Sequence, residues 1–214
     1  MLSLEEVRQA LQLAQFDSFS AQSRMRPVPR AVSRADDRRG AAQQGAVLLL
    51  LFERKEQLRF VLTRRREDLP SHAGQISLPG GRREDGESLQ ETALREAHEE
   101  VGIEPQAVTM LGRLAPLYIA PSDFEVFPFV GWYDETPDFV PQLSEVAEII
   151  EVPLAQILDD ALRREEVWER QGDSMHVPYY QINGHKVWGA TAMMLSEFAE
   201  RLRMQSDGNL ATVS

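Results

Sequence analysis

Three carboxylates near the middle of the chain are the residues best suited to chemistry. Glu96, Glu99 and Glu100 are spaced i, i+3 and i+4, so on a helix they would share one face. Like charges at this spacing weaken a bare helix by about a few tenths of a kcal/mol per pair. Hard divalent cations such as Mg²⁺ take oxygen ligands and often bridge carboxylates to a substrate phosphate. The spacing therefore predicts a metal-dependent phosphate site.

A glycine turn and a set of helix signals frame these carboxylates. Residues 79–81, Pro-Gly-Gly, end an apolar run, and glycine reaches backbone angles that are closed to other residues. Ser88 with Glu91 three residues later is a capping-box signature, and Gly102 is a helix stop. A helix is therefore expected over about 89–101, with its acidic face over a sharp turn that lets a phosphate or a metal approach the main chain.

The run from Gly81 to Ile103 resembles the Nudix box, G-x5-E-x7-R-E-U-x-E-E-x-G-U, in which U is a bulky aliphatic residue. The positions that match at the right spacing are Gly81, Glu87, Arg95, Glu96, Glu99, Glu100, Gly102 and Ile103. One position departs, because Ala97 stands where the pattern has Ile, Leu or Val. The competing interpretation is an acidic, solvated helix with a coincidental glycine frame, and the length of the match argues against it.

The resemblance implies an enzyme that hydrolyses a nucleoside diphosphate joined to another group, with Mg²⁺ or Mn²⁺ as cofactor. Glu96, Glu99 and Glu100 would hold the metal, and the carbonyl of Gly81 would be a further ligand. Metal ions neutralise charge on a diphosphate and lower the pKa of a bound water, which can then attack phosphorus.

Two residues of the box are expected to act through the loop and not on the substrate. Arg95 is expected to point away from the carboxylate face and to pair with Glu87, which would lock the loop onto the helix. A plain surface ion pair between the two is the competing interpretation.

The identity of the general base is left open between Glu96 and a carboxylate from a distant loop, for which Glu145 and Glu148 are the candidates. An ordinary solvated acidic stretch is the alternative for these two.

The segment before the box is similar to the motif of coenzyme A diphosphatases, roughly L-L-T-x-R-[SA]-x3-R-x3-G-x3-[FL]-P-G-G. The matching residues are Leu62, Thr63, Arg65, Gly74, Leu78, Pro79, Gly80 and Gly81. Val61 is a mild departure, Arg66 stands where a small residue is expected, and Pro70 stands where the motif has Arg. Residues 121–131 and 187–194 also look like that branch, so the resemblance extends from about residue 45 to about residue 203.

This resemblance implies a small nucleotide substrate like coenzyme A, cleaved to 3′,5′-ADP and a 4′-phosphopantetheine product. Arg64, Arg65 and Arg66 would supply cations for the 3′-phosphate, because arginine binds phosphate bidentately. Three adjacent arginines cannot all point one way, so one or two are expected as ligands. His72 either hydrogen-bonds a phosphate or caps its loop, and Gly80 is expected at the substrate. The alternatives are an ADP-ribose or other nucleoside-diphosphate hydrolase, a non-catalytic nucleotide-binding module, and an RNA 5′-end processing enzyme.

Composition narrows the class of protein. The chain has 214 residues, 43% of them hydrophobic, which is enough for a sizeable core, and no cysteine for disulfides or thiol catalysis. A net charge of −11 argues against broad binding of nucleic acid. The longest apolar run, residues 46–52, is too short to span a membrane, and residues 1–6 are not a signal peptide. A cytoplasmic enzyme without a nucleic-acid or membrane partner is expected.

Three parts of the chain are expected from its layout. Residues 1–44 would hold a first helix, at about 4–14, and a basic linker rich in Arg and Pro at 24–39. We interpret the linker as solvated, and an arm over the substrate or a dimer partner is the alternative. Residues 45–204 would form the Nudix hydrolase domain, and 205–214 a flexible tail.

The expected elements predict an α/β fold, a mixed β-sheet sandwiched between helices, which is also the α/β/α sandwich of the Nudix fold. Strands are expected at 45–53, 57–63, 106–118, 124–133 and 148–152, with a hairpin of 177–182 and 185–188 around Asn183-Gly184. A last helix is expected over 189–203. Its apolar residues could form a core or a homodimer interface, and the core is expected: Met193, Met194, Leu195 and Phe198.

Overall fold

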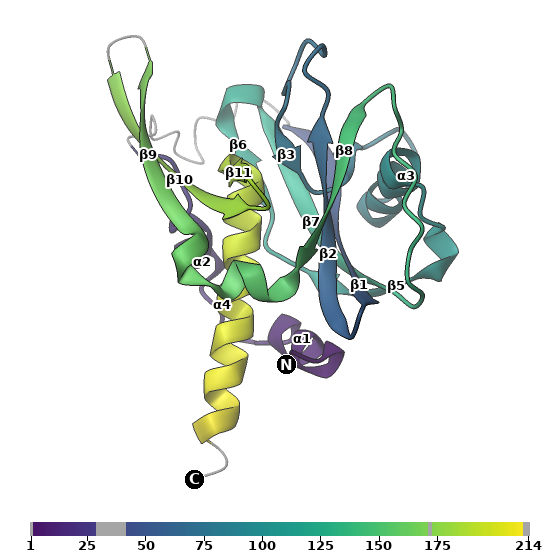
Figure 1. Ribbon diagram of the computed structural model, residues 1–214, viewed down its shortest axis with the longest axis vertical. Coiled ribbons are helices and arrows are strands. Elements are labelled where there is room, and N and C mark those ends of the chain that lie inside the picture. Colours follow the sequence, from purple (N-terminus) through teal and green to yellow (C-terminus); the bar gives the residue numbers. More distant parts are fainter. Residues whose placement is uncertain (1, 29–41, 171–172, 212–214) are drawn as a thin grey trace.

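The computed structural model describes residues 2–28, 42–170 and 173–211 of the chain (Figure 1). Most of the predicted basic linker, including Arg30, Arg34, Arg38 and Arg39, lies outside the described residues. The proposed division of the chain at residues 44 and 204 stays a prediction.

Within the described residues, eight strands form one mixed sheet around a long central strand. β1 (Gln43–Arg54) runs antiparallel to β2 (Gln57–Arg65) and parallel to β7 (Phe124–Tyr133). The order β3-β2-β1-β7-β5 forms the main path, and β4, β6 and β8 pair with β1, β7 and β2. The bounds of the other strands are Ile76–Ser77 (β3), Gly80–Arg82 (β4), Val108–Arg113 (β5), Leu117–Ile119 (β6) and Val146–Pro153 (β8).

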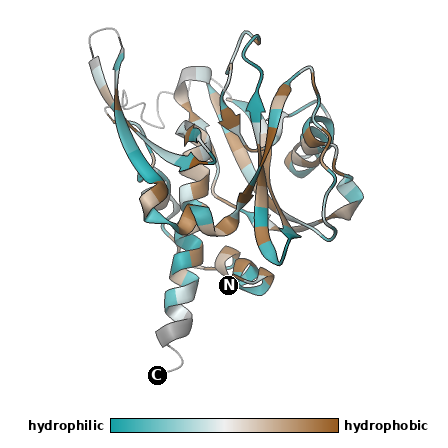
Figure 2. Ribbon diagram, in the orientation of Figure 1, coloured by the Kyte–Doolittle hydropathy of each residue, from teal (hydrophilic) through white to brown (hydrophobic). Residues whose placement is uncertain are grey.

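Helices cover both faces of this sheet, which explains the continuous apolar run of β1. Leu48 and Leu50 pack with α3 (Leu89–Val101) on one face. Leu49 and Leu51 pack on the other face in a core that includes α4 (Gly189–Ala211). Strands that are buried on both sides carry near-continuous hydrophobic runs instead of alternation. In Figure 2, hydrophobic colouring is concentrated on strands in the middle of the sheet.

α4 lies beside two short helices and a second small sheet. α1 (Leu4–Leu11) and α2 (Ser18–Ser23) pack against α4. Three further strands of the described chain, in the order β11-β10-β9, form the small sheet: Arg163–Arg170 (β9), Asp173–Ile182 (β10) and His185–Trp188 (β11). Short 3₁₀ helices lie at Pro105–Ala107, Ala120–Ser122, Leu154–Leu158 and Asp160–Leu162.

Most of the predicted elements are present, and four predictions are wrong in detail. The first helix, expected over 4–14, ends at Leu11, and the separate helix α2 was not predicted. The strand expected over 106–118 is divided into β5 and β6. Strand β9 was missed, because its sequence is mostly charged. α4 runs past the predicted end at Arg203, and part of the predicted tail is therefore helical; Gln205 of this last part hydrogen-bonds to α1.

The apolar residues of α4 serve the core, as expected. Met193, Met194, Leu195 and Phe198 are each at most 2% exposed. A homodimer therefore stays a prediction that would need another surface. In the described ranges, no helix has both the length and the apolar character needed to cross a membrane.

Candidate active site

Helix α3 has the bounds that its local signals predict. The hydroxyl of Ser88 accepts from the backbone N–H of Glu91, and the Glu91 carboxylate accepts from the N–H of Ser88 in return. At the other end Gly102 adopts a left-handed conformation with φ of 75°. Ala97 is fully buried against the sheet, so the small residue at this position of the box still packs in the core.

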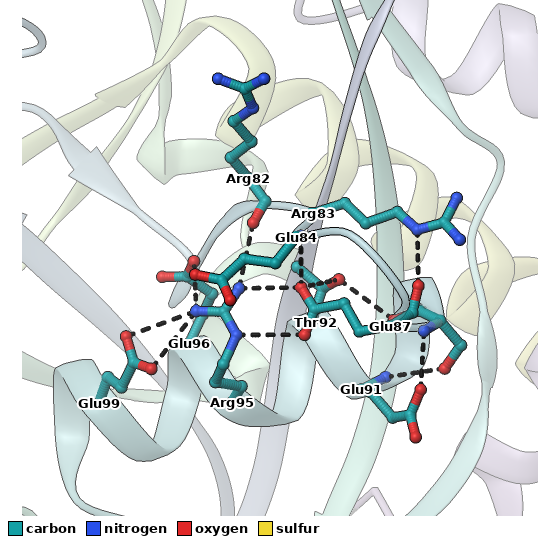
Figure 3. Close-up of polar contacts among 10 residues, drawn as sticks. Arg82, Arg83, Glu84, Glu87, Glu91, Thr92, Arg95, Glu96 and Glu99 are labelled. Carbon is teal, nitrogen blue, oxygen red and sulfur yellow. Dashed lines mark hydrogen bonds and ion pairs between the residues drawn. The ribbon is translucent and has the colours of Figure 1, made fainter.

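The guanidinium of Arg95 joins the loop before α3 to two of the carboxylates on the helix (Figure 3). Its Nε and Nη2 donate to Glu87 at 3.1 and 3.0 Å, so the predicted Arg95–Glu87 pair is present. Nη1 donates to Glu96 at 3.0 Å and to Glu99 at 3.4 Å. The expectation that Arg95 points away from the carboxylate face is therefore wrong. The planar fork of arginine carries five donors, and it reaches the loop and the helix face together.

The carboxylate of Glu87 closes the loop. Besides Arg95, it accepts from the backbone N–H of Glu84 at 2.7 Å and from the hydroxyl of Thr92 at 2.8 Å. The hydrogen bond from Arg95 is the main cause that lowers the pKa of Glu87 to about 2. Glu87 is therefore ionised at neutral pH and holds the loop onto the first turns of α3.

The carboxylates of Glu96 and Glu100 are largely shielded from solvent. Glu100 is 8% exposed, and the hydroxyl of Thr63 lies 3.4 Å from its Oε2. Burial, followed by the charges of Glu96 and Glu145, raises the pKa of Glu100 to about 8. Burial also raises the pKa of Glu96. A Cβ on Gly81 would lie 2.4 Å from the Glu96 carboxyl carbon, so only glycine allows this close approach.

The donor chemistry of this face fits a hard divalent cation. Glu96, Glu99 and Glu100 share this side of α3; Glu96 and Glu100 are desolvated, and the charge of Glu96 disfavours ionisation of Glu100. A bound cation would offset that repulsion. In the part of the chain that the structure describes, no three acidic or histidine side chains are already gathered closely enough to enclose an ion. Arg95 bonds Glu96 and Glu99, while Glu100 lies buried against Thr63.

The three consecutive arginines at the end of β2 each pair with a carboxylate. Arg64 contacts Glu148 at 3.0 Å, and Arg65 contacts Glu145 at 3.1 Å. Arg66 contacts Asp68, which follows it in the chain, at 2.6 Å. Arg64 and Arg65, the last two residues of β2, lie on opposite faces of the sheet, as successive residues of a strand do. Their substrate-binding role stays a prediction, and a phosphate ligand would have to replace a carboxylate.

The two candidates for a distant base lie on different faces. Val61 packs with α3 and Leu62 with the α4 core, so Arg65 shares the α3 face and Arg64 the opposite one. Glu148, with Arg64, is directed to the α4 side, where His185 of β11 lies 3.4 Å away. The charge of Glu145 raises the pKa of both Glu96 and Glu100. The structure thus favours Glu145 over Glu148 at the carboxylate face.

His72 and Gly80 have structural reasons for their positions. His72 has a φ of 58°, and its Nδ1 lies 2.8 Å from the Gln75 side-chain oxygen, so it caps its own loop. Gly80 pairs with β1 so closely that a Cβ would lie 2.4 Å from the carbonyl oxygen of Ala46. Contact of either residue with a substrate stays a prediction.

Two residues of this region had no role assigned from sequence. Thr63 matched the motif before the box, but only the fold shows that its hydroxyl reaches Glu100. The side chain of Arg82 has no hydrogen-bond or ion-pair partner within the described ranges, and Figure 3 shows it directed away from its neighbours. Its position directly after Gly81 was the signal available in the sequence.

The structure combines a mixed sheet between helices with a helix that presents carboxylates to a glycine turn. This combination defines a class of proteins to which known relatives also belong. A family model of the NUDIX domain matches residues 42–172. The chain belongs to the Nudix family, whose members are hydrolases that act on pyrophosphate bonds of nucleotide-like substrates and generally require divalent metal ions.

Similar proteins agree with this assignment. An uncharacterized Nudix hydrolase, NudL, of Photorhabdus laumondii is 36% identical over 184 residues, which cover 86% of this chain and 94% of that protein. Nudix hydrolase 15, mitochondrial, of Arabidopsis thaliana is 34% identical over 75% of this chain and 59% of its own length. The solved Nudix hydrolase RenU of M. Smegmatis shares the fold, with a TM-score of 0.52 and 19% identity over 78% of this chain and 87% of that one.

Proposed function

We propose that the protein is a metal-dependent diphosphatase of coenzyme A or its thioesters, with 3′,5′-ADP and 4′-phosphopantetheine as products. One observation carries the choice of substrate. The segment that resembles the coenzyme A diphosphatase motif, residues 62–81, reaches α3 carboxylates near both of its ends. Near its start Thr63 reaches Glu100, and at its end Gly81 lies against Glu96. A motif that contacts two of the proposed metal ligands supports the choice of substrate.

In this proposal Glu96, Glu99 and Glu100 hold Mg²⁺ or Mn²⁺, with the carbonyl of Gly81 as a further ligand. When bound, the cation supplies charge neutralisation at the diphosphate and a lowered pKa for a water ligand. Glu100 contributes a buried carboxylate that is costly to ionise without a cation. Arg95 holds Glu96 and the loop in a fixed relation, which limits the geometries that the carboxylates can adopt.

Hydrolysis also needs a group that accepts the proton of the attacking water. We assign this to Glu145, because its charge acts on both Glu96 and Glu100 and because it is half-exposed, within reach of solvent. The water adds to one phosphorus atom and loses its proton to the carboxylate, and the bond from that phosphorus to the bridging oxygen breaks. The second phosphate leaves with the bridging oxygen.

In this proposal the 3′-phosphate is bound by an arginine whose present carboxylate partner is easily replaced. Arg66 is the most exposed of the three arginines, and its partner Asp68 is itself 63% exposed. Its Nη1 also donates to the carbonyl of Leu143 at 2.7 Å, in an exposed contact that would leave Nε and Nη2 for a phosphate. A phosphate offers the same bidentate geometry as that carboxylate with more charge. We therefore propose Arg66 as the 3′-phosphate contact. A cytoplasmic location accompanies the proposal as a prediction.

The test is product analysis with coenzyme A, 3′-dephospho-coenzyme A and ADP-ribose, each with Mg²⁺ or Mn²⁺. Release of 3′,5′-ADP with a clear preference for coenzyme A is the expected result. Equal turnover of the forms with and without the 3′-phosphate, or a preference for ADP-ribose, would reject coenzyme A and keep the Nudix chemistry. Turnover of none of them by a protein that still binds nucleotide would indicate a non-catalytic module.

A further inference from the structure

We propose that Arg65 is a positioning residue, which holds the Glu145 carboxylate on the side of the sheet that α3 covers and does not read the substrate's 3′-phosphate. The inference rests on the proposed function in one respect, which is that Glu145 takes part in diphosphate cleavage. It assigns different tasks to adjacent arginines of one motif.

The side chain and the backbone of Arg65 both form hydrogen bonds to other parts of the chain. Its Nη1 lies 3.1 Å from Glu145 Oε2, and its Nε donates to the carbonyl of Ser71 at 3.2 Å. Its backbone N–H donates to the carbonyl of Gln75 at 2.9 Å. The side chain thus ties the loop before the glycine turn to the segment that carries Glu145. A phosphate reader would have to give up both side-chain contacts.

The strand register brings Glu145 to this position. Arg64 pairs with Glu148, and in a regular antiparallel ladder Arg65 would pair with Ala147. It pairs with Val146 instead, because the register shifts between Arg64 and Arg65. Such a bulge redirects the side chains next to it. The carbonyl of Glu145 then accepts from the backbone N–H of Arg66 at 3.0 Å, which fixes the main chain at that point.

Electrostatics explains why this carboxylate needs a cation beside it. The segment of Glu145 is joined to α3, because the backbone N–H of Gln142 donates to the carbonyl of Glu100 at 3.0 Å and the N–H of Glu145 donates to the carbonyl of Gln142 at 2.9 Å. The charge of Glu145 acts unfavourably on Glu96 and Glu100, and this repulsion would drive its side chain outward into solvent. Arg65 is the basic group that opposes this repulsion, since its charge also acts favourably on Glu100. Without Arg65, the Glu145 carboxylate would lose its direction, and the segment that carries it would lose an anchor.

Two other arginine–glutamate pairs show that such a pair alone does not make a site. Arg64 and Glu148 join the same two strands on the opposite face, beside His185. Arg54 and Glu151 lie 2.9 Å apart near the far ends of β1 and β8, with exposure similar to that of Arg65. Arg54→Ala is therefore a matched control, which removes an equivalent pair at the end of β1 opposite the residues that pair with the glycine turn.

The experiment is a double-mutant cycle of Arg65→Ala and Glu145→Gln, with kcat and KM measured for coenzyme A and 3′-dephospho-coenzyme A. Each single variant should lower kcat by roughly 10-fold to 100-fold for both substrates, because a misdirected base loses much of its contribution. The double variant should be no slower than the slower single one. Arg65→Lys should recover part of kcat. Arg54→Ala should leave kcat unchanged.

Two results would overturn the proposal. One is a rise in KM for coenzyme A alone after Arg65→Ala, with kcat kept, which is the behaviour of a 3′-phosphate reader. The other is multiplication of the two single effects in the double variant. If another diphosphate is the better substrate, the same cycle is measured with it, so an error in the substrate leaves this test intact.

A measurement without turnover completes the test. The backbone N–H groups of Glu145 and Val146 both donate to the carbonyl of Gln142. Arg65→Ala should speed hydrogen–deuterium exchange of these amides, because the segment loses an anchor, and Arg54→Ala should not. Unchanged exchange in Arg65→Ala would show that Arg65 does not hold the segment and would reject the positioning role, whatever the activity.

Discussion

Two hydrogen bonds, of 3.0 and 3.1 Å, join the guanidinium of Arg95 to the carboxylate of Glu87 across the loop before α3. The same guanidinium donates to the carbonyl of Arg82 at 3.1 Å and to Glu96 at 3.0 Å. One side chain therefore fixes the loop and a proposed metal ligand together. The four predictions that follow concern this unit and the buried carboxylate beside it.

Arg95→Ala should lower the free energy of unfolding by about 1.5–3 kcal/mol, because it removes charge-assisted hydrogen bonds to a largely buried carboxylate. Activity should also fall, since Glu96 loses a contact. Arg83→Ala is the control from the same loop, where the contacts to Gln44 and the Glu87 carbonyl are exposed. It should change stability by about 0.5 kcal/mol or less. Chemical denaturation measures both, and equal losses would contradict the assigned role of Arg95.

The lowered pKa of Glu87 predicts that the folded protein loses stability in acid. Its pKa is about 2 in the folded protein against an ordinary value of 4.5, so its contribution is full above pH 4.5. As the pH falls from 4.5 towards 2, the unfolded chain takes up the proton first, and the contribution is lost. Glu87→Gln should flatten this part of the pH–stability curve, measured by urea denaturation. A variant with the same acid slope as the wild type would show that Glu87 is not stabilised by Arg95.

The raised pKa of Glu100 predicts the opposite dependence of stability on pH for the metal-free protein. Its pKa is raised from 4.5 to about 8, so the folded state favours the protonated form. Its contribution is full below pH 4.5 and is lost as the pH rises to 8. Glu100→Gln should therefore stabilise the protein at pH 8 in the presence of EDTA, as seen by an increase in Tm. It should also weaken the increase in Tm that Mg²⁺ or Mn²⁺ produces in the wild type. A Glu100→Gln protein that is less stable at pH 8 in EDTA would reject this account.

Gly81→Ala should reduce kcat by roughly 100-fold, because the added methyl group would lie 2.4 Å from the Glu96 carboxylate and displace it. Gly208→Ala is the steric control, since a Cβ there meets nothing within 4 Å. It should keep full activity. Circular dichroism would establish that both variants are folded. Wild-type turnover by a folded Gly81→Ala protein would show that Glu96 does not need its present position.

Much of the site could be predicted from residues close together in the chain. The capping box of Ser88 and Glu91 and the stop at Gly102 set the bounds of α3, because hydrogen bonds across three or four residues determine helix ends. The spacing of the carboxylates then places them on one side of the helix. The hairpin at Asn183-Gly184 was predictable from local sequence too, because its turn type needs positive φ and this residue pair favours it. Both residues have positive φ in the structure.

Only the tertiary structure decided which charges meet. Arg65 and Glu145 are far apart in sequence, and their contact depends on the pairing of β2 with β8 and on a one-residue shift in that register. The same pairing sends Glu148 to the other face, where it meets Arg64. A strand pattern repeats every two residues, so one residue of shift changes the face that a side chain occupies. That shift reflects the packing of the whole sheet, which no local spacing contains.

The burial of Glu100 has the same origin. Its spacing from Glu96 predicts only that the two carboxylates are neighbours on a helix. Its raised pKa comes from desolvation against β2, where Thr63 is its hydrogen-bond donor. The sequence by itself determined the chemical groups, the helix that carries them and the family. The tertiary structure decided their hydration and their partners, because both depend on surfaces brought together from distant parts of the chain.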